Sequence, residues 1–144
     1  MSSSIDFDLA MLGSSDIPDA SVARRVTLAE SVSGKGRWVR QNCCGGNFGI
    51  VELRLEPYRG PSQFQLVWQV TEEQIPEEFL AGVLEGIHRA VLLDHADSGL
   101  LTSIRIVIIG GAYHPVDSSQ RAFTIATQKA FVDALAKTKL VMVE

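Results

Sequence analysis

The sequence has no long apolar run, few cysteines and no excess of positive charge. Its longest apolar stretch, residues 104–109, is interrupted by Arg105 and is far shorter than the roughly 20 residues that a membrane-spanning helix needs. Asp6 and Asp8 stand where a secretory signal would carry its apolar segment. We therefore expect a cytoplasmic protein with no membrane association.

The two cysteines, Cys43 and Cys44, are adjacent. Neighbouring cysteines do not close an ordinary disulfide without strain, and this pair lacks the C-x-x-C spacing of zinc sites. The remaining potential ligands near one another in sequence match no zinc signature: His88, Asp94, His95 and Asp97. We expect two reduced thiols, no metal site and no cofactor.

The net charge of −4 has an uneven distribution. The first 20 residues contain four aspartates and no Lys or Arg, which accounts for the whole excess of 17 acids over 13 bases. A neutral remainder argues against a general nucleic-acid binder, because affinity for phosphates needs clustered cations. One local cluster is present between Arg24 and Arg40, where five basic residues accompany a single Glu30.

A chain of 144 residues is the size of one domain. Residues 1–23 are rich in Ser and Asp and show no sustained period, so we predict a flexible acidic N-terminal tail. The folded domain is then expected to cover residues 24–144.

Four strands are predicted first, at residues 26–32, 36–42, 49–56 and 63–70, with a turn at Ser33–Gly36. A helix is predicted from Pro76 to Leu93, because apolar residues recur there with helical spacing. The dense Ile and Val of residues 102–109 predict a further strand. A second helix is predicted over 118–137 with Asp117 as N-cap and Gln120 completing a capping box, followed by a short strand at 140–143.

The resulting order, β-β-β-β-α-β-α, indicates an α+β fold with two helices on one face of a mixed sheet. Its glycine-rich runs support no nucleotide binding, since neither has the P-loop or dinucleotide-binding pattern. His114 with Asp117, Ser118 and Ser119 suggests a Ser-His-Asp site. However, a helix N-cap explains the Asp and Ser types, and triad members normally converge from separate segments. We expect no enzyme. Trp38 and Trp68 are either core residues or exposed stacking platforms.

The run Gly110-Gly-Ala-Tyr-His-Pro-Val-Asp-Ser-Ser119, followed by Ala122-Phe123 and Ala130-Phe131, resembles the signature of the fourth domain of elongation factor G. Weaker similarities precede it in the family's order: Ile75-Pro76 with the Gly82-to-His88 helix, Gly34–Gln41, and Gly45-Gly46 with Phe48-Gly49. The resemblance covers roughly residues 24–144. It implies a fold like domain 2 of ribosomal protein S5, with a mixed four- to five-stranded sheet and an unusual left-handed β-α-β crossover.

In that family, loops at the tip of the domain enter the ribosomal decoding centre. Carried over, the tip loops are Asn42–Phe48 and Gly111–Val116, with His114 at the apex. The resemblance implies a translation-related module without GTPase activity that binds the small ribosomal subunit, its rRNA or tRNA, and that either acts at the decoding centre or supports a partner translation factor. The residues expected to bind RNA are Arg40, Gly45, Gly46, Asn47, Gly111, Tyr113 and His114.

The chain departs from the family pattern at both tip loops. The first loop lacks the family's Arg after the glycines, and Pro115 replaces an acidic residue after the loop histidine. These departures and the neutral body favour an alternative, a repurposed protein-interaction domain that self-associates and makes no RNA contact. The intact His114 loop favours RNA binding.

Overall fold

The computed structural model describes residues 3–8, 25–42, 45–93 and 100–142. A five-stranded mixed sheet has the strand order β1-β5-β7-β4-β3. Its strands are β1 (Ser3–Phe7), β3 (Val32–Asn42), β4 (Gly45–Pro57), β5 (Phe64–Trp68) and β7 (Ile104–Ala112). A second, three-stranded sheet has the order β6-β2-β8 and consists of β2 (Arg25–Leu28), β6 (Leu100–Leu101) and β8 (Leu140–Met142). The helices are α1 (Leu80–Leu93), preceded by the 3-10 turn η2 (Glu77–Phe79), and α2 (Gln120–Leu135).

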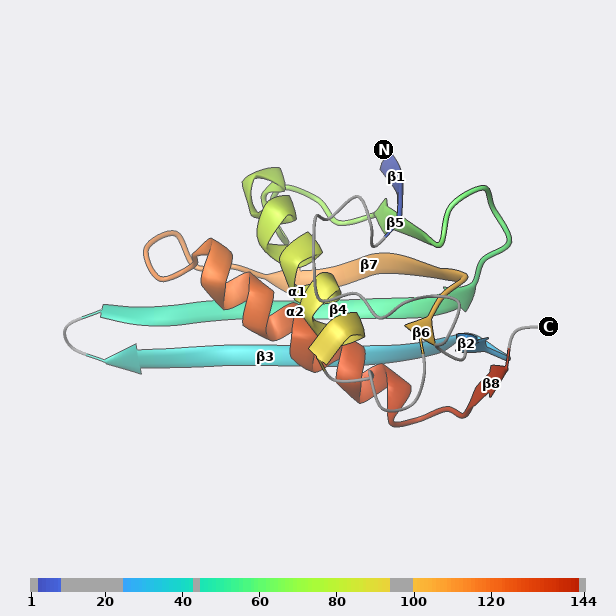
Figure 1. The fold of residues 1–144 in the computed structure, drawn as a ribbon. Coiled ribbons are helices and arrows are strands. Elements are labelled where there is room, and N and C mark those ends of the chain that lie inside the picture. The colour runs from blue at the N-terminus through green and yellow to red at the C-terminus, as the bar shows by residue number, and fades with distance from the viewer. Residues whose placement is uncertain (1–2, 9–24, 43–44, 94–99, 143–144) are drawn as a thin grey trace.

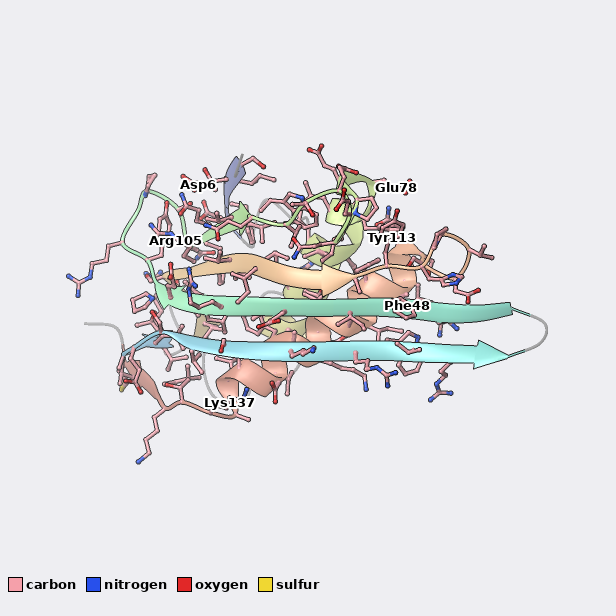
Figure 2. All side chains as sticks on the ribbon, turned by 180° about the vertical axis from the view of Figure 1, so that it is seen from behind. Asp6, Phe48, Glu78, Arg105, Tyr113 and Lys137 are labelled. Atoms are coloured by element: carbon pink, nitrogen blue, oxygen red, sulfur yellow. The ribbon has the colours of Figure 1, made fainter. Side chains whose placement is uncertain are left out.

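Both helices lie on one face of the large sheet (Figure 1), and the opposite face is open in the view from behind (Figure 2). The core fills the space between the two layers. Alternate residues of β4 point into it, as predicted, and Val51, Leu53 and Leu55 are fully buried. The predicted apolar faces of both helices are buried as well, including Ile87 of α1 and Phe123 of α2. The predicted α+β class is confirmed.

The connection from β5 through α1 to β7 has the rare handedness. β5 and β7 are parallel neighbours, with Leu66 opposite Ile106. When the helices face the viewer, both strands point to the left and β7 lies below β5 (Figure 1). The crossover is therefore left-handed, against the strong right-handed preference of such units, as the resemblance implied.

The predicted turn at Ser33–Gly36 is wrong, because β3 runs without interruption from Val32 to Asn42. Its glycines serve close packing instead. A Cβ at Gly34 would lie 2.2 Å from the carbonyl oxygen of Ala130, and one at Gly36 would lie 1.8 Å from that of Ala126. Glycine at these positions lets the backbone of α2 lie directly on β3.

Other boundaries also differ from the predictions. Ser3–Phe7, within the predicted flexible tail, forms β1 and pairs antiparallel with β5. Phe7 stacks on Phe64 with ring centroids 5.4 Å apart, so an apolar anchor holds this added edge strand. Residues 9–24 lie outside the described residues. The predicted strand at 102–109 begins at Ile104, because Ser103 adopts a left-handed φ of 61° that ends the extended backbone.

None of the described helices is long and apolar enough to cross a membrane.

Candidate functional site at the tip of the sheet

The loop between β7 and α2 lies at the same end of the molecule as the hairpin ends of β3 and β4 (Figure 1). We call this end the tip: loop residues 113–119 with residues 39–42 of β3 and 45–48 of β4. Two hydrogen bonds join the loop to β4. The backbone N–H of Phe48 donates to the carbonyl of Asp117 at 3.1 Å, and the Ser118 hydroxyl donates to the carbonyl of Phe48 at 2.7 Å. The loop is therefore fastened to the sheet.

Consecutive polar residues at the start of α2 have separate roles. Asp117 is not the N-cap that the sequence predicted. Ser119 is, since its side chain accepts from the backbone N–H of Ala122 at 3.1 Å. Ser118 closes the loop instead, because its Oγ also accepts from the backbone N–H of His114 at 2.8 Å. Gln120 completes no capping box. Its side chain reaches α1, where its Oε1 accepts from the backbone N–H of Gly82 at 2.7 Å.

His114 is held by the backbone that follows it. Its Nδ1 accepts from the N–H groups of Val116 at 3.2 Å and Asp117 at 3.1 Å. A ring nitrogen that accepts carries no proton, so the proton of the neutral ring is on Nε2. The side chain is 40% exposed, and its ring centroid lies 6.1 Å from that of Phe48. The loop thus presents an oriented imidazole, with an N–H donor, to the surroundings.

The same geometry bears on the Ser-His-Asp interpretation. The Ser118 hydroxyl donates to a backbone carbonyl and accepts a backbone N–H, and Nδ1 of His114 is occupied by two backbone donors. The carboxylate of Asp117 lies 3.7 Å from Nδ1. These side chains are used to shape the loop, and this arrangement gives no support to nucleophilic catalysis.

Tyr113 and Gly111, which were predicted to bind RNA, have packing roles in the structure. Tyr113 packs against the core, and its ring lies 6.5 Å from that of Phe79. Figure 2 shows Tyr113 on the side of the loop that faces Glu78. A Cβ at Gly111 would lie 2.4 Å from the carbonyl of Ile50, so the strand spacing itself requires glycine there.

The remaining predicted residues lie on the β3–β4 ladder. Arg40 is opposite Asn47, and Gly45 and Gly46 are also paired with β3. The predicted loop Asn42–Phe48 is therefore mostly strand, and its Cys43 and Cys44 lie outside the described residues. Arg40, Gly46 and Asn47 lie at the paired ends of β3 and β4, which are at the same end of the molecule as the loop between β7 and α2 that carries His114 (Figure 1).

Sequence reasoning missed the residues that fasten the tip. Phe48 and Ser118 act through contacts 70 positions apart, which no local pattern predicts. The described residues contain no group of three His, Cys, Asp or Glu side chains that could hold a metal ion. The Asp94–Asp97 region lies outside them.

Together, the mixed sheet, the two helices on one face and the left-handed crossover define an α+β domain of the type found in domain 2 of ribosomal protein S5. The sequence model of the family described as "Elongation factor G, domain IV" matches residues 20–139. The chain therefore belongs to the elongation factor G domain IV family. The match is to this domain and does not include the GTPase domain of the factor.

Curated relatives are elongation factors G. That of Thermotoga maritima is 33% identical over 125 residues, and that of Petrotoga mobilis is 35% identical over 129 residues. Each alignment covers 85% of this chain and 18% of the relative, so the chain spans less than a fifth of these relatives' length. A crystal structure of a Thermus thermophilus protein superposes with a TM-score of 0.72 at 32% identity, covering 82% of this chain and 17% of that one.

Proposed function

We propose that this chain is a non-catalytic module of translation that acts in the cytoplasm, binds the small ribosomal subunit through its tip and hydrolyses no GTP. The observation that carries the proposal is the His114 loop. It is fastened to β4 by two hydrogen bonds, it orients the imidazole, and it leaves the ring partly exposed. A surface that is fixed before binding loses little conformational freedom on binding.

The tip offers groups that suit RNA. The Nε2–H of His114 donates to a phosphate or base acceptor, and its ring is available for stacking on an unpaired base. Arg40 and Asn47 lie opposite each other on the adjoining strands, where they supply a cation and an amide. The ligand is rRNA or a tRNA bound to the subunit. A translation factor is the protein partner that the family relation favours.

The experiment is equilibrium binding of the whole chain to purified small ribosomal subunits over a range of salt concentrations. We expect saturable binding that weakens as salt rises. His114→Asn is the informative variant, because its amide oxygen replaces Nδ1 as acceptor for the backbone N–H groups while the ring is lost. It should weaken binding about tenfold or more, consistent with about 1–3 kcal/mol for one stacked base, and leave the melting temperature unchanged. No saturable binding at low salt would overturn the proposal.

A second function is favoured by one feature at the opposite end. The three-stranded sheet of β2, β6 and β8, which we call the base, exposes two apolar side chains, Val141 at 40% and Met142 at 59%. They border a groove that also contains Leu28, Pro57 and Tyr58. Exposed apolar surface of this kind marks protein contacts, including self-association. Sedimentation of wild type and Met142→Lys tests it: a concentration-dependent dimer in wild type alone supports a self-associating domain.

A further inference from the structure

One aromatic ring on β3 has two cations against it. Trp38 is on the helix-facing side of β3, since it continues the alternation of Gly34 and Gly36, whose missing side chains would meet α2. The ring is partly buried against the core. The Cζ of Arg40 lies 4.4 Å from its centroid, and the Nζ of Lys129, from α2, lies 5.5 Å from it. Both distances are within the roughly 6 Å at which an aromatic face attracts a cation.

No carboxylate neutralises this pair within the part of the chain that the structure describes. The salt bridges found there include neither Arg40 nor Lys129, and both residues are exposed. The acid four residues after Lys129, Asp133, pairs instead with Lys137 at 3.1 Å. Blue side-chain nitrogens project from the β3 edge near the end of this strand (Figure 2). The pair is therefore positioned by the ring and keeps its positive charge for an external anion.

Resting on the proposed function, we propose that Arg40 and Lys129 bind phosphate groups of ribosomal RNA along the β3–α2 edge, which begins at the tip with Arg40. Trp38 is the positioning residue, because it holds both cations on its ring and limits the side-chain freedom that binding would otherwise remove. We infer that the anion is RNA, because this cation pair adjoins the surface that the proposed function assigns to RNA. Arg40 pairs with Asn47, close to the Asn42–Gly45 pair that ends the β3–β4 ladder. The interface thus extends from the His114 loop onto the flank of α2.

The test compares salt dependences of binding to purified small ribosomal subunits. Each phosphate contact contributes about 0.7 to 0.9 to the slope of log K against log salt. The double variant Arg40→Gln/Lys129→Gln should therefore lower the slope by about 1.4 to 1.8. The control, Arg59→Gln/Lys139→Gln, removes the same charge near the grooves that β8 borders at the base, and its slope should equal that of wild type. Melting temperatures of both variants should match wild type.

Trp38 is tested in the same assay. Trp38→Phe keeps an aromatic face and should keep the wild-type slope, whereas Trp38→Leu should lower it although no charge is lost. Wild-type binding with an unchanged slope in the Arg40/Lys129 variant, or an equal decrease in the Arg59/Lys139 control, would overturn the phosphate site and leave the proposed function standing. Absence of saturable wild-type binding would overturn both.

Discussion

At the interface between α2 and β3, glycine and alanine let a helix lie directly on a strand. At the tip, the loop carries larger side chains that are partly or largely exposed: Val116 is 82% exposed and His114 is 40% exposed. In the first region the packing requires glycine, because a Cβ added at Gly34 or Gly36 would lie only about 2 Å from a carbonyl oxygen of α2. The second is determined by a few hydrogen bonds. Substitutions should therefore separate the two, with stability lost at the interface and binding lost at the tip.

The largest effect is expected from Gly36→Ala. Its Cβ would lie 1.8 Å from the carbonyl of Ala126, so α2 must move away from β3. We expect the free energy of unfolding to fall by about 3 kcal/mol, measured by urea titration. Gly110→Ala is the control, because its nearest contact is 3.4 Å, to the flexible carboxylate of Glu52, and it should change stability by less than about 0.5 kcal/mol. Equal losses in the two variants would contradict the close-packing account of β3.

The next largest effect on stability is expected from substitutions of the two adjacent serines, Ser118 and Ser119. Ser118→Ala removes the hydroxyl that accepts from the His114 N–H and donates to the Phe48 carbonyl. The free energy of unfolding should fall by about 1–2 kcal/mol. Ser119→Ala removes the N-cap and should cost about 1 kcal/mol. Thermal unfolding measures both losses.

The two serine variants differ in binding. Only Ser118→Ala removes one of the two hydrogen bonds that join the His114 loop to β4, so it should weaken binding to small ribosomal subunits while Ser119→Ala leaves it near wild type. If both variants lowered binding equally, loop position would not be the property that the tip contributes.

The smallest effect is electrostatic. Asp133 accepts from the backbone N–H of Lys35 and from the Lys137 ammonium, each at 3.1 Å, and these bonds, the backbone one foremost, hold the pKa of Asp133 below its ordinary value. A lowered folded pKa stabilises the protein above the unfolded pKa, and the contribution is lost as pH falls through the folded pKa. Because the pair is exposed, Asp133→Asn should cost only about 0.5 kcal/mol at pH 7.

The difference between wild type and Asp133→Asn should shrink as the pH is lowered through the range where Asp133 is protonated, measured by urea titration at a series of pH values. High salt should reduce it at neutral pH too. A difference that grew toward acid pH would show that the charge of Asp133 does not stabilise the α2–β3 interface.

Periodic segments were predictable from the sequence, and residues with long-range contacts were not. The buried faces of α1 and α2 follow from spacing alone. Gly34 and Gly36 resemble turn residues locally, and only the position of α2 shows that they remove a steric clash. Likewise, β1 forms by pairing with the edge of β5. Asp8, directly after β1, adds a contact there by accepting from the backbone N–H of Gln63 at 2.6 Å.

The site shows the same division. By residue type, any of Asp117, Ser118 and Ser119 is suitable as the N-cap. Ser118 instead donates to the carbonyl of Phe48, which is far away in sequence, and Ser119 is the N-cap. The position of His114 at the tip was predicted from the resemblance. The packing of Tyr113 on Phe79 depends on where α1 begins, which no local pattern contains.

The central claim is that the tip, rather than the base, faces ribosomal RNA. It is tested most directly by tethering a hydroxyl-radical reagent to a single cysteine, introduced as Val116→Cys at the tip or Val141→Cys at the base, in a chain with Cys43 and Cys44 replaced by serine. Both valines are exposed. The account predicts specific rRNA cleavage in small subunits from position 116 and none from position 141. Cleavage from position 141 alone, or from neither, would contradict it.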